Sequence, residues 1–295
     1  MFIRRLPRFD YHTPASLPEA IQLLSAHGRD AKLLAGGTDL ILAMKKHTVA
    51  PAHLINLKMI PGLSGITADS GGVTIGALTT MAEIERSAII RETYTPLWDA
   101  VSVMASPQVR TLATIGGNLV SAVPSADTAP PLMVLSAEAH ITGPAGERTC
   151  PVEALFAGPS ACSLAPDDIV TRITIPVPAG IGAYLKLMRR AALDLALVGV
   201  AAYVSLDAKK VCKEVKIALG AVAPTPIRAA AAEAVLLGKV LTEDLAAEAA
   251  RMAGTECRPI TDIRASQDYR CSMVEVLTKR ALLKAMSRYT QGGTE

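Results

Sequence analysis

Hydrophobic and polar positions in the first 57 residues switch between helical and extended spacing. An S-x-x-E capping box at residues 16–19 is followed by apolar residues at helical spacing as far as Gly28, which predicts a helix over 17–27. Apolar runs at 30–35 and 53–57 have the length of strands. The pattern predicts a small α/β unit in the order helix, strand, loop, helix and strand.

The pattern changes after the Pro61-Gly62 turn. Short β-like segments separated by turns alternate with helical segments until a proline and glycine cluster at 176–182. This pattern predicts a second, α+β subdomain. Its expected strands include 71–77, 137–143 and 169–176, and its expected helices lie near 81–87 and 96–105.

The third region combines three longer apolar strands with helices. Alternating apolar and charged positions in the last strand indicate that it is half-buried. Strands are expected at 183–189, 196–206 and 211–221, and helices at 229–237, 242–253 and 269–289. We therefore predict an α+β protein with three parts, residues 1–57, 58–177 and 178–295.

Composition narrows the class of protein. Half of the residues are hydrophobic, 19% are charged and the net charge is +3, which argues against disorder. Lysine and arginine are scattered, with short clusters such as Arg4-Arg5, so we expect no nucleic-acid partner. The longest nearly uncharged apolar stretch, Leu195–Leu206, is too short for a transmembrane segment. A cytoplasmic location is expected.

Cysteine and histidine spacing predicts no metal site. The five cysteines are far apart and never form CxxC, and the histidines lack metal-ligand spacing. We expect the thiols to be free and buried. The cysteines are Cys150, Cys162, Cys212, Cys257 and Cys271, and the histidines are His12, His27, His47, His53 and His140.

Two paired-glycine loops are the main chemical signal. Each places Gly-Gly beside a hydroxyl and an amide or carboxylate. Glycine lets backbone N–H groups approach a bulky anion, and two such loops suit a diphosphate. A single glycine pair more often makes only a tight turn. The sequence contains neither a P-loop nor a strand-linked GxGxxG, so a dinucleotide would bind in another way.

Five segments in order resemble the FAD-binding medium subunit of the molybdenum hydroxylases, a family that includes bacterial xanthine dehydrogenase and carbon monoxide dehydrogenase. The resemblance runs from about Phe9 to about Ala285. The segments are LLAGGTDLI, ASPQVRTLATIGGNL, PSADTAPPLMVLSA, GAVAPTPIRAAAAEA and DIRASQDYR.

The resemblance implies a two-subdomain FAD-binding fold of the vanillyl-alcohol oxidase (PCMH) type. A C-terminal α+β subdomain would follow, with a three-stranded antiparallel sheet and helices. FAD would lie between the first two subdomains with its diphosphate on the two glycine loops. Neither loop contains a histidine or cysteine, so we expect the FAD to be non-covalent.

The implied cofactor residues match the family's motifs position by position. Asp127 would contact FAD beyond the second loop, Val170 would meet the adenine end, and Lys186 would approach the flavin. Met104 stands where animal xanthine dehydrogenases have an aromatic residue on the ring. The first loop contributes Leu33, Leu34, Ala35, Gly36, Gly37, Thr38, Asp39 and Leu40, and the second Thr114, Ile115, Gly116, Gly117 and Asn118.

Three of these residues have alternatives or departures. Asp127 also fits a carboxylate at a helix N-terminus, and Lys186 also fits a solvated strand lysine. Met104 departs from the aromatic residue, although a thioether can pack on a flavin face. Arg264 and Arg270 fit either an anchor for a subdomain or partner, or an exposed charge cluster.

The implied function is electron transfer without a catalytic residue or metal in this chain. A molybdopterin-binding large subunit would hydroxylate the substrate, and a small subunit with two [2Fe–2S] clusters would pass electrons to FAD. NAD⁺ or another acceptor would then take them. The family typically assembles as a dimer of heterotrimers. We expect a purine (xanthine) dehydrogenase ahead of a carbon monoxide or aromatic N-heterocycle dehydrogenase.

Two other classes stay open. One is a stand-alone flavin reductase similar to the UDP-N-acetylenolpyruvylglucosamine reductases, and the other is a flavin-free structural subunit. The 4-hydroxybenzoyl-CoA reductase branch is disfavoured because no cysteine-rich insertion lies between Asn118 and Ala137.

Overall fold

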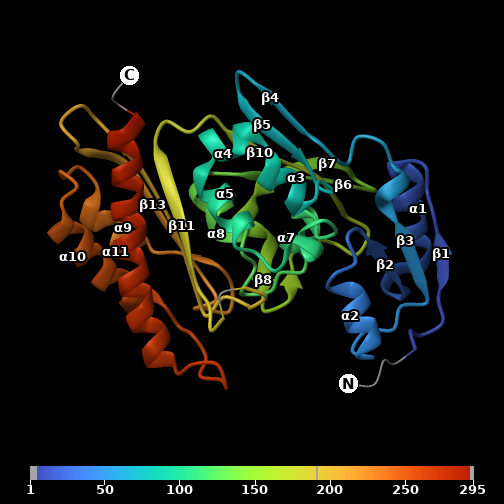
Figure 1. Ribbon diagram of the computed structural model, residues 1–295. Helices are drawn as coiled ribbons and strands as arrows, with labels where there is room; N and C mark the ends of the chain where they lie inside the picture. Colours follow the sequence, from blue (N-terminus) through green and yellow to red (C-terminus); the bar gives the residue numbers. More distant parts are fainter. Residues whose placement is uncertain (1–4, 191, 293–295) are drawn as a thin grey trace.

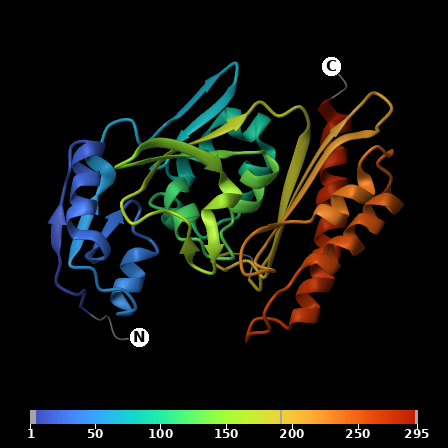
Figure 2. The same cartoon turned by 180° about the vertical axis from the view of Figure 1, so that it is seen from behind.

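The computed structural model describes residues 5–190 and 192–292, which form three units arranged in a row. Figures 1 and 2 show the N-terminal unit at one end, the C-terminal helices at the other and a mixed sheet-and-helix unit between them. Arg4, from the basic pair noted in the sequence, lies outside the described residues.

The first unit is a three-stranded parallel sheet in the order β1-β3-β2. Its helix α1 begins where Ser16 Oγ accepts a hydrogen bond from the Glu19 N–H, and it ends at Gly28 with φ +52°. The predicted helix at 17–27 is confirmed. The elements are β1 (Asp10–His12), α1 (Leu17–His27), β2 (Ala31–Leu34), α2 (Leu40–Lys45) and β3 (His53–Asn56).

The middle unit is a five-stranded antiparallel sheet in the order β4-β5-β10-β6-β7. The predicted strands at 71–77, 137–143 and 169–176 are its three inner strands. Its strands are β4 (Ile66–Asp69), β5 (Gly72–Gly76), β6 (Glu138–Gly143), β7 (Gly146–Pro151) and β10 (Ile169–Pro176), with the separate pair β8 (Phe156–Gly158) and β9 (Ala161–Cys162).

Short helices and an aliphatic core pack against this sheet. The core joins Ile75 and Ile173 of the inner strands to Leu97 and Leu132 of the helices. The helices are α3 (Met81–Arg86), α4 (Ala88–Thr93), α5 (Thr95–Ser102), α6 (Pro107–Arg110), α7 (Ile115–Val120) and α8 (Ala129–Val134).

The third unit contains the three long predicted strands in an antiparallel sheet, to which a two-residue fourth strand is added. Within the described residues, no helix is long and apolar enough to cross a membrane. The elements are β11 (Ile181–Leu187), β12 (Val198–Leu206), β13 (Cys212–Gly220), β14 (Ile227–Arg228), α9 (Ala230–Leu236), α10 (Glu243–Glu256) and α11 (Gln267–Gly292).

The strand β12 is apolar on both faces because it serves two cores. Val200 and Val204 belong to the core under α10 and α11. Ala201 and Tyr203 point the other way and belong to the core of the middle unit. The period-two alternation of a strand therefore joins the C-terminal sheet to two layers of helices.

A buried carboxylate ties the middle unit to the third. Asp99 on α5 is 5% exposed. It accepts hydrogen bonds from the Tyr184 N–H of β11 at 3.0 Å, from Lys284 Nζ at 3.0 Å and from both Arg288 terminal nitrogens at 2.8 Å. Two cations and a strand amide thus satisfy one buried charge, as burial requires.

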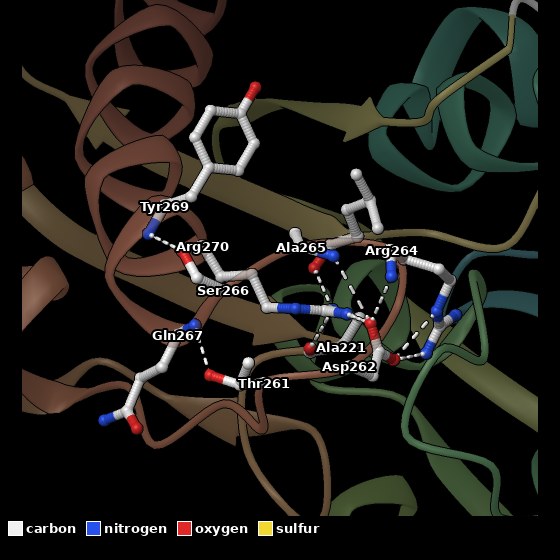
Figure 3. Close-up of polar contacts among 10 residues, drawn as sticks. Ala221, Thr261, Asp262, Arg264, Ala265, Ser266, Gln267, Tyr269 and Arg270 are labelled. Carbon is white, nitrogen blue, oxygen red and sulfur yellow. Dashed lines mark hydrogen bonds and ion pairs between the residues drawn. The ribbon is translucent and has the colours of Figure 1, made fainter.

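Arg270 anchors α11 to the ends of the C-terminal strands (Figure 3). Its side chain is 2% exposed and donates to the Leu197 carbonyl at 2.9 Å and to Asp262 Oδ1 at 2.9 Å. A longer bond reaches the Ala221 carbonyl at 3.4 Å. Hydrogen bonding to Arg264 holds the pKa of Asp262 below its usual range. Arg270 is therefore an internal anchor and not an exposed charge.

We expect Arg270→Ala to lower the free energy of unfolding by about 3–5 kcal/mol, because it leaves Asp262 and two carbonyls without their buried cation. Arg264→Ala is the matched control. That arginine bonds the same carboxylate from a half-buried position, so its loss should cost about 1 kcal/mol or less. Chemical denaturation of both variants measures the difference, and equal losses would contradict the anchoring role.

Candidate functional site

The first glycine loop offers free backbone donors at the carboxyl end of a strand. It follows β2 and leads into α2, and its residues are half-buried except for exposed Asp39. Gly37 has φ +75°, a conformation that favours glycine. Among the described residues, none accepts a hydrogen bond from the backbone N–H of Gly36, Gly37 or Thr38. Such a loop can hold an anion.

The second glycine loop is built differently, because its N–H groups already have partners. Thr114 caps α7 by accepting from the Gly117 N–H at 3.2 Å, and the Gly116 N–H donates to the Ala77 carbonyl at 2.9 Å. A Cβ on Gly116 would lie 2.8 Å from Ala77 Cβ. The glycines here permit close packing, and direct cofactor contact by this loop stays a prediction.

The two loops touch although they are far apart in sequence. A Cβ on Gly36 would overlap the carbonyl oxygen of Leu112, just before the second loop. Ser121, directly after α7, donates its hydroxyl to Asp39 Oδ2 at 2.8 Å. Sequence reasoning missed Ser121, since nothing local shows that it faces the first loop.

The segment after the second loop is held by a side-chain bond. Asn118 Oδ1 accepts from Thr128 Oγ1 at 2.6 Å, which closes the turn that leads to α8. Asp127 comes directly before Thr128 in this turn and is 7% exposed. The bond between Asn118 and Thr128 therefore ties the second loop to the residue next to Asp127.

Asp127 and Lys186 form a buried ion pair. Lys186 Nζ donates to Asp127 Oδ2 at 2.8 Å, and the Lys186 side chain is 1% exposed. This burial excludes the solvated strand lysine. Tyr184 donates its hydroxyl to Asp127 Oδ1 at 3.0 Å. Asp127 lies before α8, but its carboxylate oxygens bond to β11.

Burial sets the proton affinities of this cluster. It raises the pKa of Asp127, although the charge of Lys186 and the bonds from Lys186 and Tyr184 oppose that change. Burial and the neighbouring Asp127 charge raise the pKa of Tyr184 well above its usual value. Tyr184 thus stays a neutral donor. Its position two residues before Lys186, on the same strand face, is the signal that sequence reasoning overlooked.

Met104 and Val170 are both buried in the core of the middle unit. Met104 is 5% exposed in the core of the middle unit, and its carbonyl accepts from Arg110 at 2.8 Å. Val170, on β10, precedes Thr171, whose carbonyl accepts from the Ala77 N–H at 2.9 Å. The Ala77 carbonyl in turn meets the second loop. The ring contact of Met104 and the adenine contact of Val170 remain predictions.

Comparison with known families covers almost the whole chain. Residues 7–178 match the FAD binding domain in molybdopterin dehydrogenase, and residues 183–285 match the CO dehydrogenase flavoprotein C-terminal domain. The free backbone donors of the first loop are suited to the diphosphate of a dinucleotide. The chain is therefore a flavoprotein subunit of an oxidoreductase.

Individual relatives define the group more closely. The carbon monoxide dehydrogenase medium chain of Hydrogenophaga pseudoflava is 38% identical over 96% of this chain and 98% of its own. The xanthine dehydrogenase FAD-binding subunit of Escherichia coli O157:H7 is 33% identical over 94% of this chain and 96% of its own. The chain belongs to the FAD-binding medium subunits of the molybdenum hydroxylases.

Solved structures agree with this assignment. A carbon monoxide dehydrogenase from Hydrogenophaga pseudoflava gives a TM-score of 0.93 at 38% identity, covering 97% of this chain and 99% of that one. Quinoline 2-oxidoreductase from Pseudomonas putida 86 gives 0.91 at 32% identity, with the same coverage of 97% and 99%. The predicted fold of the FAD-binding type is confirmed.

We expect Gly36→Ala to weaken FAD binding about tenfold or more, because the added methyl overlaps the Leu112 carbonyl and pushes the two loops apart. The measurement is FAD released by acid per purified chain. Gly158→Ala is the control, since a Cβ there would lie 3.8 Å from Ala161 in ordinary contact. Full FAD content in Gly36→Ala would contradict the role of the loop contact.

Proposed function

We propose that this chain is the electron-transfer subunit through which a molybdenum hydroxylase complex reaches its final acceptor. It would assemble with a molybdopterin-binding large subunit and a small subunit carrying [2Fe–2S] clusters. The observation that carries the proposal is the buried pair of Lys186 and Asp127. Thr128, the residue after Asp127, is bonded to Asn118 of the second glycine loop. The buried pair would hold the Lys186 ammonium in a fixed position for a redox cofactor bound nearby.

Each part of the site has a role in this proposal. The N–H groups of Gly36, Gly37 and Thr38 hold the FAD diphosphate. When bound, FAD supplies a centre that takes up electrons singly and gives them up in pairs. Lys186 supplies a desolvated positive charge, whose effect on a nearby anion is stronger than in water. Asp127 and Tyr184 orient that charge.

The relatives support the complex and leave its substrate open. Carbon monoxide dehydrogenase and xanthine dehydrogenase subunits both match nearly end to end. The substrate would be chosen by the large subunit, so the preference for purine stays a prediction. NAD⁺ as acceptor, the dimer of heterotrimers, the three domain boundaries and the cytoplasmic location belong to the same proposal.

Two rival functions make different demands on the protein. A stand-alone flavin reductase needs its own substrate pocket, whereas the matched relatives include a medium chain and an FAD-binding subunit of dehydrogenases. A flavin-free subunit has no use for the unpaired donors of the first loop. Both rivals are separated from the proposal by the experiment below.

The test is anaerobic reduction of the complex purified with its partner subunits, followed by visible absorption and by electron paramagnetic resonance. We expect [2Fe–2S] signals and one FAD per copy of this chain, with the flavin bleached after the substrate of the large subunit is added. A complex without FAD, or a flavin that bleaches only with NADPH and a sugar nucleotide, would overturn the proposal.

We expect Lys186→Ala to retain FAD but to make its reduction potential more negative by about tens of millivolts, because a buried cation near the reduced cofactor is lost. A spectroelectrochemical titration gives the potential. Lys213→Ala, which removes a largely exposed lysine from β13, should leave it unchanged. An unaltered potential in Lys186→Ala would remove this residue from the site.

A further inference from the structure

Three histidines that are distant in sequence meet in the first unit. Their ligand nitrogens all lie within 4.8 Å of one another. His12 Nε2 and His53 Nδ1 are 3.1 Å apart, and the rings of His27 and His53 stack with centroids 3.6 Å apart. All three side chains are half-buried. The linear spacing predicted no such site.

The fold explains why these side chains converge. In the parallel pairing of β1 with β3, His12 lies opposite Ile55 and Asp10 opposite His53. His53 and Ile55 are two residues apart on β3, so their side chains project from the same face of the sheet. Because His12 lies opposite Ile55, its side chain projects from that face too. Ile55 packs in one buried core with Leu24 of α1. That face is therefore covered by α1, whose last residue is His27.

The surroundings suit a cation. His27 ends α1, and the C-terminal end of a helix carries partial negative charge. The exposed carboxylate of Asp10 lies 3.8 Å from His53 Nδ1. Three imidazoles with an oxygen donor nearby match the preferences of zinc and similar divalent transition metals. Magnesium and calcium prefer oxygen ligands instead.

We propose that His12, His27 and His53 bind a zinc-class divalent ion, with water or Asp10 as the fourth ligand. Nitrogens around tetrahedral zinc lie about 3.4 Å apart, and the stacked rings of His27 and His53 would turn so that their nitrogens converge on the ion. The ion would link β1, β3 and α1 in a small unit that has a limited core. Small units often depend on such links.

The site would be structural and separate from the flavin. His53 pairs with Ala31 at the amino end of β2, whereas the first glycine loop follows Leu34 at the carboxyl end. The four residues of β2 span about 10 Å from one end of the strand to the other. The ion would brace β3, the strand that pairs with β2, without touching the cofactor.

The test is isothermal titration of the metal-free, untagged, FAD-loaded full chain with zinc chloride. We expect one saturable site per chain, at least tenfold weaker binding in His27→Gln, and no site for magnesium. His47→Gln is the matched control, because His47 is exposed and outside the cluster. Absence of saturable zinc binding, or equal binding in His27→Gln, would overturn the proposal.

A second measurement separates the histidines from two thiols that zinc could also reach. Cys257 Sγ and Cys271 Sγ lie 2.8 Å apart, although burial raises the pKa of Cys257 and so disfavours the thiolate that binds metals. X-ray absorption of the zinc-loaded chain should show nitrogen neighbours at about 2.0–2.1 Å. The same spectrum is expected for the zinc-loaded Cys271→Ser variant. Sulfur neighbours at about 2.3 Å would overturn the assignment.

Discussion

The buried charge of Asp99 sets the geometry on which the remainder of this subunit depends. Its carboxylate joins α5 to the backbone of Tyr184 in β11 and to two cations of α11. Because Tyr184 and Lys186 share one face of β11, fixing that backbone also fixes where their side chains reach Asp127. An ion pair at the junction of two units thus positions the charges of the candidate flavin site. Removal of either side would leave a buried charge uncompensated.

The two glycine pairs show that one sequence motif can serve two physical purposes. In the first loop the absent side chain leaves N–H groups free and permits the positive φ of Gly37. In the second, the N–H groups are used internally, and Gly116 instead allows α7 to approach Ala77. The loop with free N–H groups and the loop whose N–H groups are bonded internally therefore look alike in sequence. Only the hydrogen-bond partners distinguish them.

Local signals predicted local structure well. The cap at Ser16 and the stop at Gly28 gave the limits of α1, and the short β-like segment that closes on Pro176 gave β10. The three-residue, mostly exposed β1 carries no such pattern and was missed. The family's motifs indicated Lys186 and Asp127, but their mutual bond, Tyr184 and the histidine cluster depend on strand register. Register and helix placement are tertiary properties that spacing along the chain does not encode.

The Asp99 junction also has a consequence for biosynthesis. Asp99 is separated from Lys284 and Arg288 by 185 and 189 residues, so during translation it emerges long before them. At ribosomal rates of about 5–20 residues per second, the wait is about 10–40 s. The strands β11 and β12 emerge earlier in that interval and can cover the apolar surface of the middle unit, but the Asp99 carboxylate lacks its two cations until α11 has been made. Docking of α11 is therefore the last step in completing the junction between the middle and third units.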